Sequence, residues 1–268
     1  MTTFGIKLFP NKKLGVALGG GIARGIAHVG VLKALVQAGI QIDYLSGVSS
    51  GALIGAAFAA GVSILDIEKS AIGRWWGNFV KIALNKRGAT SNESIGNFLI
   101  RYIGDVNFSK LKIPLRIAAT DLISGERVVF SQGKVADAVR ASCSMPGIFI
   151  PSKIDSKLLV DGGISGNLPV AEAFEMGAEK VIAVEVMPNI KLKEEPRDMV
   201  SIVDRSITLL FRNSVTTSKQ NADLVIEPVV ENIGLLDLGK AKQLIAMGEC
   251  ATLQVLPQIK KLIAPFSF

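Results

Sequence analysis

Histidine and cysteine are scarce in this sequence, which contains one histidine and two cysteines. Cys143 and Cys250 lie far apart and outside any CxxC pattern, so a reducing compartment is expected and a disulfide framework is not. Because His28 is the sole histidine, the usual ligands of a metal site are also missing. We therefore expect no metal site.

Charged residues are missing from residues 44–65, a run long enough to cross a membrane on length alone. Its glycines and serines instead favour a strand followed by a buried helix in an α/β sheet. The N-terminus lacks the long apolar segment and the small-residue cleavage site of a secretion signal. We expect a cytoplasmic protein with no signal peptide and no transmembrane helix.

Basic residues outnumber acidic ones and give a formal net charge of +7. This excess predicts an acidic partner, either nucleic acid or anionic lipid. Zinc-finger spacing, RNA-binding aromatic patterns and dense basic helices are absent from the sequence, so nucleic acid is not expected. Peripheral contact with an anionic membrane is the favoured interpretation.

One apolar stripe could make that contact. Its residues recur at three- and four-residue spacing beside basic ones, and they are Ile72, Trp75, Trp76, Phe79 and Val80 with Arg74, Lys81, Lys86 and Arg87. Aromatic residues next to basic ones suit a membrane interface. Such a stripe more often packs against the core, and Gly73 and Gly77 weaken the helix. Both interpretations stay open.

Strand-like and helix-like segments alternate along the chain. Apolar runs predict strands at residues 14–18, 44–48, 114–120, 127–130, 150–154, 157–160, 180–186 and 224–227. Helical patterns occupy 26–38, 62–77, 93–103, 135–142, 169–176, 202–219 and about 239–263, with a capping box at Thr90–Glu93 and a kink or break at Pro257. Because no linker or repeat intervenes, we predict one α/β domain over residues 1–268 with a largely parallel sheet.

The stretch Gly47-Val48-Ser49-Ser50-Gly51 follows one predicted strand and precedes a helix. A strand, a sharp turn and a helix in that order form a nucleophile elbow, which would place Ser49 at its apex. Gly47 and Gly51 have no Cβ, so the turn can be strained and the helix can pack close to the strand. The alternative is a simple glycine–serine turn before a buried helix, and the pentapeptide alone does not decide between them.

A second glycine-rich segment, Gly19–Gly25, joins the first predicted strand to the first helix. Its backbone NH groups could bind a phosphate or an oxyanion. A dinucleotide site would also need a carboxylate at the end of the second strand. Asp43 precedes that strand and Ser49 occupies its end, so the oxyanion interpretation is favoured.

A serine nucleophile needs a neighbouring base. In an α/β-hydrolase triad the histidine follows the serine along the chain. His28 precedes Ser49, which excludes that triad and favours a packed or capping role for the histidine. The base is then a carboxylate. Asp161 is the best candidate because it ends a strand and precedes two glycines, and Asp121 is the second.

These segments in this order resemble the patatin-like phospholipase family. More specifically, four segments resemble its bacterial branch related to neuropathy target esterase: ALGGGIARGIAHVGVLKAL, ASCSMPGIF, LLVDGGISGNLPV and ADLVIEP. The resemblance covers residues 14–246. It implies a three-layer α/β/α fold and a serine lipid acyl hydrolase that acts on phospholipids or other fatty-acyl esters without a metal or cofactor.

The resemblance also implies a role for each matching residue. Ser49 would be the nucleophile and Asp161 the general base of a Ser-Asp dyad. The backbone NH groups of Gly20, Gly21 and Ile22 would form the oxyanion hole. Arg24 would fix the loop or bind an acidic headgroup, and His28 would not serve as the base. The supporting glycines would be Gly25, Gly47, Gly51, Gly162 and Gly163.

Ile22 departs from the family loop, which usually has glycine at the matching position. A β-branched residue resists positive φ, so we expect a reshaped loop, a weaker oxyanion hole and slow turnover. Two alternatives therefore stay open. The chain could be a weakly active lipid-binding or regulatory protein because of Ile22, or an acyltransferase because the same acyl-serine could react with an alcohol or a thiol. The sequence does not determine the oligomeric state.

Overall fold

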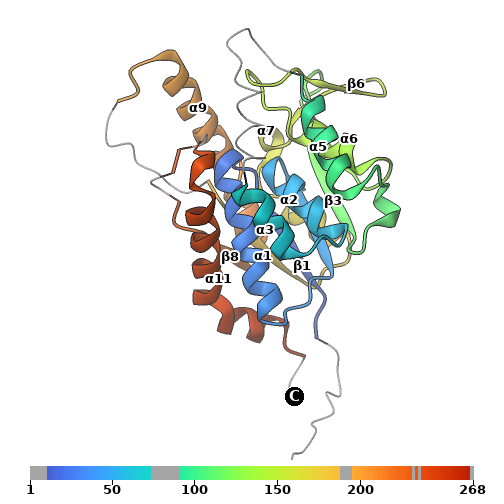
Figure 1. Cartoon of the computed structure of the whole chain (residues 1–268), viewed down its shortest axis with the longest axis vertical. Coiled ribbons are helices and arrows are strands. Elements are labelled where there is room, and N and C mark those ends of the chain that lie inside the picture. The colour runs from blue at the N-terminus through green and yellow to red at the C-terminus, as the bar shows by residue number, and fades with distance from the viewer. Residues whose placement is uncertain (1–10, 74–90, 188–194, 231–232, 235–236, 266–268) are drawn as a thin grey trace, which may run out of the picture.

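The computed structural model describes residues 11–73, 91–187, 195–230, 233–234 and 237–265 (Figure 1). Its strands are β1 (Leu14–Leu18), β2 (Tyr44–Val48), β3 (Leu115–Asp121), β4 (Arg127–Phe130), β5 (Ser152–Ile154), β6 (Lys157–Asp161), β7 (Lys180–Val184) and β8 (Leu224–Ile226). Its α-helices are α1 (Ala27–Gln37), α2 (Ser50–Ala59), α3 (Ile64–Ile72), α5 (Glu93–Ile103), α6 (Val135–Ser142), α7 (Gly163–Gly166), α8 (Val170–Glu175), α9 (Met199–Asn213), α10 (Thr216–Asn221) and α11 (Ala241–Ile263). Short 3-10 turns are η1 (Ile22–Ile26), η2 (Phe108–Lys110) and η3 (Leu238–Lys240).

The described strands form one eight-stranded mixed sheet. Strands β8, β7, β1, β2 and β3 lie side by side in that order and pair in parallel. Strands β4 and β6 pair antiparallel with β3, and β5 pairs antiparallel with β6. Parallel neighbours require crossover connections, which the intervening helices supply. The α/β fold with a largely parallel sheet that the sequence predicted is confirmed.

Helices cover both faces of the sheet. Val16 and Leu18 of β1 point into a large apolar cluster that includes residues of α1, α2 and α11. Ala17, between them, points to the opposite face and packs in a second cluster with Val170 and Ala173 of α8. This alternation follows from the two-residue repeat of a strand that is buried on both faces. The predicted three-layer α/β/α arrangement is therefore confirmed.

Helices α1 and α11 lie against each other at a very short distance (Figure 1). A Cβ at Gly30 of α1 would stand 1.9 Å from the Ile245 carbonyl oxygen of α11. A Cβ at Gly248 of α11 would stand 2.0 Å from the Ala27 carbonyl oxygen of α1. Each helix thus has a glycine where the backbone of the other helix passes.

The predicted capping box at Thr90–Glu93 is wrong in its details. Helix α5 begins at Glu93, so Asn92 is the N-cap residue, and its side chain makes no capping hydrogen bond. The Asn92 amide is buried and donates to Ser144 Oγ at 2.7 Å and to the Ile150 carbonyl at 2.9 Å. The side chain that would cap the helix is used instead to hold the segment after α6.

Two helix breaks in the C-terminal third also differ from the prediction. The single helix expected over residues 202–219 is two helices, α9 and α10, that are separated near Ser214, whose hydroxyl donates to the Phe211 carbonyl at 2.7 Å. Pro257 does not divide α11, which runs from Ala241 to Ile263. A proline removes only one helical hydrogen bond, and Leu253, which loses its donor, is exposed so that water can reach it.

Helix α3 ends at Ile72, and the predicted Trp75–Trp76 stripe lies in residues 74–90, outside the described residues. Among the helices that the structure describes, none combines the length and the apolar character needed to span a bilayer.

Candidate active site

Strands β2 and β6 lie end to end along one edge of β3. Strand β4 occupies the other edge, because Ile117 and Ala118 of β3 pair with both β2 and β4, and Ala119 pairs with both β4 and β6. In this register Val48 lies opposite Ala118, and Asp161 lies opposite Ala119, the next residue of β3. The last residues of two strands that are far apart in sequence therefore meet, and this brings Ser49 to Asp161.

Ser49 occupies a strained turn between β2 and α2. Its backbone has φ 53° and ψ −123°, a conformation that non-glycine residues rarely adopt. The Ser49 NH donates to Ser142 Oγ at 2.8 Å, and that hydroxyl donates to the Ala118 carbonyl at 2.7 Å. Ser142 thus ties the strained turn to β3, and the geometry is that of a nucleophile elbow.

The flanking glycines allow close contacts that a Cβ would prevent. A Cβ at Gly51 would lie 2.2 Å from the Leu18 carbonyl oxygen, and one at Gly47 would lie 2.6 Å from Ala52 Cα. A Cβ at Gly162, which follows Asp161, would lie 2.2 Å from the Ala118 carbonyl oxygen. These three positions accept only glycine without movement of the backbone.

Asp161 is fully buried beside the serine. Its Oδ1 accepts the Gly163 NH at 2.9 Å, whereas Oδ2 has no hydrogen-bond partner of normal geometry among the described residues. Burial raises the pKa of Asp161 to about 7, and the nearby Ser49 hydroxyl and the Gly163 NH oppose this rise. A carboxylate with a pKa near neutrality is suited to accept and return a proton.

The glycine loop packs directly against Ser49, since a Cβ at Gly20 would lie 3.0 Å from Ser49 Cβ. Two of its three predicted oxyanion donors are already occupied. The Gly20 NH donates to Asn167, to Oδ1 at 3.2 Å and to the carbonyl at 3.3 Å, and the Gly21 NH donates to Ser50 Oγ at 3.0 Å. The Ile22 NH, at the start of η1, makes no such bond with any described residue. The three predicted donors are thus adjacent to the serine, but only one is available in this conformation.

Ile22 adopts the positive φ that the sequence comparison with the family loop made doubtful. Its φ is 49°, and its side chain packs partly against the core. A β-branched residue in this region costs about 1–3 kcal/mol. The loop therefore has a left-handed backbone conformation at Ile22, and this residue is strained.

Replacing Ile22 with glycine is expected to relieve this strain and let the loop turn its NH groups towards the serine. We expect phosphonylation of Ser49 by a fluorophosphonate to become faster, by up to about 10² if one oxyanion donor is regained. The second-order rate of labelling measures this. Ala23→Gly, in the same loop at a residue without positive φ, is the control and should not gain. Equal rates for Ile22→Gly and wild type would show that Ile22 does not limit the site.

Arg24 fixes the far side of the loop. It is buried, its Nε donates to the Ile233 carbonyl at 2.8 Å, and its Nη1 contacts Met187 Sδ at 3.7 Å. Gly25 faces Ser50, whose Oγ would lie 2.0 Å from an added Cβ. The geometry favours the loop-fixing role of Arg24 over headgroup binding.

His28 and Asp121, the other groups weighed as bases, lie elsewhere. His28 is fully buried in α1 and its Nε2 donates to the Gly19 carbonyl at 2.7 Å. Burial lowers the pKa of His28 to about 4, against the effect of that hydrogen bond, so the ring is neutral. The Asp121 side chain accepts the Ile123 NH and the Ser124 hydroxyl, both at 3.2 Å, and so holds the turn after β3.

Asn167 is a site residue whose role the sequence did not reveal. It is fully buried, and its Nδ2 donates to the Gly20 carbonyl at 2.9 Å in addition to accepting the Gly20 NH. Its own NH donates to Ser214 Oγ at 3.1 Å. Asn167 thereby joins the glycine loop to the segment after Asp161. The only sequence signal was its place in LLVDGGISGNLPV.

Cys143 is a second neighbour that sequence reasoning missed. Its thiol lies beside Ser49 and Asp161, and burial together with the Asp161 charge raises its pKa well above the usual value. It therefore stays a neutral thiol at the site. Among the described residues no group of three or more histidine, cysteine, aspartate or glutamate side chains could hold a metal ion.

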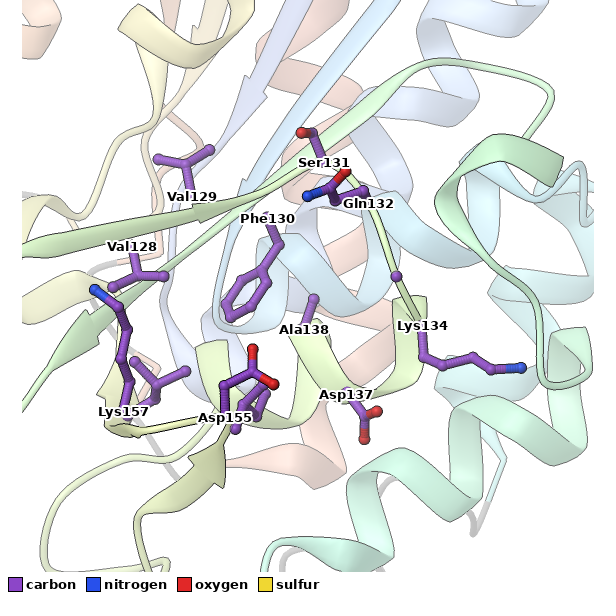
Figure 2. Close-up of a pocket in the computed structure, with 13 residues that line it drawn as sticks. Val128, Val129, Phe130, Ser131, Gln132, Lys134, Asp137, Ala138, Asp155 and Lys157 are labelled. Atoms are coloured by element: carbon purple, nitrogen blue, oxygen red, sulfur yellow. The ribbon is translucent and has the colours of Figure 1, made fainter.

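A separate hollow of about 570 Å³ opens beside α6 and β4. Figure 2 shows Phe130 pointing into it from β4, with Asp155 and Lys157 at its edge. Neither Ser49, Asp161 nor any residue of the glycine loop lines it. The hollow is therefore distinct from the candidate dyad.

Comparisons with known proteins assign the chain to a family. The family model of the patatin-like phospholipases matches residues 16–174. An uncharacterised NTE family protein of Mycobacterium tuberculosis is 36% identical over 176 residues, which make up 65% of this chain and 49% of that protein. The neuropathy target esterase of Drosophila melanogaster is 33% identical over 182 residues, or 65% of this chain and 13% of that protein. A lysophospholipase of Emericella nidulans is 32% identical over 181 residues, or 65% of this chain and 12% of that protein.

Among solved structures, VipD from Legionella pneumophila has a TM-score of 0.57 at 15% identity, covering 93% of this chain and 67% of that one. This likeness concerns the fold. The chain thus spans about half the length of this mycobacterial relative and a smaller share of the other two. The family model spans the glycine loop, the elbow and Asp161. The chain belongs to the patatin-like phospholipase family, in the branch related to neuropathy target esterase.

Proposed function

We propose that this chain is a serine lipid acyl hydrolase of the phospholipase A or lysophospholipase type. The observation that carries the proposal is the meeting of β2 and β6 on β3. It places a strained serine beside a buried carboxylate whose pKa is raised to about 7. A serine and a base in contact are the minimal requirement for an acyl-enzyme mechanism.

In the proposed reaction, the Ser49 oxygen attacks the ester carbonyl while its proton passes to Asp161 Oδ2. The negative charge that develops on the carbonyl oxygen is stabilised by loop NH groups, with Ile22 as the donor that is free of internal bonds. Collapse of the tetrahedral species breaks the ester bond, and the leaving alcohol takes the proton from Asp161. Water then attacks the acyl-serine, again giving its proton to Asp161, and the fatty acid leaves as Ser49 recovers its hydrogen.

The substrate class follows from the family and from two relatives, which are a neuropathy target esterase and a lysophospholipase. We infer that the acyl ester is a phospholipid, a lysophospholipid or another fatty-acyl ester. The net charge of +7 favours substrates with anionic headgroups or an anionic surface.

A second candidate function is that of a weakly active lipid-binding protein. Two observations favour it: the NH groups of Gly20 and Gly21 are engaged within the protein, and Ile22 is strained. In that case substrate or product would bind with little turnover.

Labelling with a fluorophosphonate, read by intact mass, tests the proposal. Wild type should form one adduct and Ser49→Ala should form none. Ser63→Ala is the control, because it removes an exposed serine hydroxyl that caps α3 through Asp66 and should keep the adduct. Release of fatty acid from a lysophospholipid by wild type, absent in Ser49→Ala, then identifies the hydrolase. A folded wild type that neither labels nor releases fatty acid would favour the lipid-binding function.

A further inference from the structure

Helix α9 carries apolar residues on two faces. On the inner face Phe211 is buried and Ile207 packs against the core. On the outer face four large side chains are exposed: Met199 by 80%, Ile202 by 51%, Val203 by 46% and Leu210 by 48%. Their spacing places them in one strip about 16 Å long. A surface helix normally needs one apolar face for the core, so the second strip is left without a packing role among the residues that the structure describes.

The inner face of α9 is fixed to the candidate active site. The Phe211 ring lies 2.7 Å from the position of a Cβ at Gly163, two residues after Asp161. Ser214, just after the helix, accepts the Asn167 NH at 3.1 Å. The outer strip therefore begins beside the segment that follows Asp161, and Figure 1 shows α9 extending from there at one end of the molecule.

A second exposed apolar point lies at the same end of the sheet. Leu122 and Ile123, in the turn that follows β3, are exposed by 50% and 80%. Strands β2 and β3 are parallel, so this turn and Ser49 both follow carboxyl ends of adjacent strands. Two apolar contacts at the end that carries the candidate dyad would orient the protein on a flat surface.

We propose that the outer face of α9, with Leu122 and Ile123 as a second contact, binds the surface of an anionic phospholipid bilayer. This rests on the proposed lipid hydrolase function, since the bilayer would supply the acyl ester. Helix α9 carries Arg205, which lies one turn after Ile202 at the edge of the strip, and Arg212 further along, and the chain has a net charge of +7. Basic side chains beside an exposed apolar helix face bind anionic interfaces. A second copy of the chain would bring like charges together instead.

Vesicle flotation tests the proposal in the Ser49→Ala background, so that the result does not depend on hydrolysis. The protein should float with vesicles of phosphatidylcholine and phosphatidylglycerol and bind pure phosphatidylcholine vesicles more weakly. The double replacement Ile202→Gln with Val203→Gln should weaken binding by about tenfold or more, and Ile123→Gln should weaken it less. The matched control is Leu253→Gln, which replaces a side chain of α11 that is 51% exposed and should leave binding unchanged. Circular dichroism and the thermal midpoint establish that each variant is folded.

Three results would overturn the proposal. The first is that the folded Ser49→Ala protein floats with neither vesicle. The second is that the α9 double variant binds as tightly as the Leu253→Gln control. The third is that the double replacement converts a dimer to a monomer without changing vesicle binding, which would assign the strip to contact between copies. None of these results bears on whether Ser49 and Asp161 hydrolyse esters, because labelling and fatty-acid release test that separately.

Discussion

Replacing Asp161 with asparagine is expected to slow the fluorophosphonate labelling of Ser49 and ester hydrolysis by about 10²–10⁴, the range of a general base. Asparagine keeps the size of the side chain and can still accept the Gly163 NH, but it cannot take the serine proton. The rate constant for adduct formation measures the effect. Asp121→Asn is the control, because Asp121 is the carboxylate at the end of β3 and its side chain holds only the turn that follows.

The pH dependence of labelling should identify Asp161 as the group that titrates. The wild-type rate should rise with pH and level off above about 7, because only the ionised carboxylate accepts a proton and burial raises the pKa of Asp161 to about 7. His28 cannot cause this rise of the labelling rate with pH, since burial lowers its pKa to about 4. In Asp161→Asn the labelling rate should no longer rise with pH in this range. If Asp161→Asn labels at the wild-type rate and with the same pH dependence, Asp161 is not the base.

The same replacement is expected to stabilise the protein at alkaline pH. The pKa of Asp161 is about 7 in the folded chain, higher than the ordinary aspartate value of 3.8 that applies to the unfolded chain. Ionisation therefore costs stability above pH 3.8, and the cost is complete above about pH 7. The full difference is about 4 kcal/mol, from which an unpaired amide subtracts about 1–3 kcal/mol. Urea unfolding at pH 8 should show Asp161→Asn to be more stable than wild type, with the difference lost near pH 4.

The strand ends that carry the site residues could be predicted, because they depend on local patterns of apolar residues and glycines. The apolar runs of β1 and β2, the glycines of the elbow and the Asp-Gly-Gly at the end of β6 each mark a strand end. These local signals predict Ser49 and Asp161 as site residues. The end-to-end arrangement of β2 and β6 was not predictable, since it depends on how three strands share the edges of β3.

The partners of the glycine loop could not be predicted from the sequence. Gly20 is separated from Asn167 by 147 positions, and a buried amide gives no periodic signal that would reveal its acceptor. For the same reason the engagement of the Gly20 and Gly21 NH groups was not foreseen. The sequence predicts a reshaped loop at Ile22, because a β-branched residue resists positive φ, but in the structure Ile22 adopts a positive φ. Local rules also failed at Asn92, where a buried contact replaces the helix cap.

Replacing Gly30 with alanine is expected to lower the free energy of unfolding by about 3 kcal/mol, the upper range of overpacking effects. The new Cβ would lie 1.9 Å from the Ile245 carbonyl oxygen and 2.7 Å from the Glu249 nitrogen, both of which are backbone atoms of α11. No side-chain rotation relieves such a contact, so α1 and α11 must separate. Urea unfolding at constant pH measures the loss, and Gly248→Ala should behave alike because its Cβ would meet the Ala27 carbonyl oxygen at 2.0 Å.

Gly96→Ala is the matched control for this prediction. Gly96 lies inside α5, and the atom nearest to its added Cβ is 3.7 Å away, an ordinary contact. Alanine should therefore stabilise this helix by up to about 1 kcal/mol through its higher helix propensity. Equal stabilisation by Gly30→Ala would mean that α1 and α11 do not pack as described. Gly30→Ala should also slow labelling of Ser49. The displaced helix α1 carries His28, whose ring holds the Gly19 carbonyl at the start of the glycine loop.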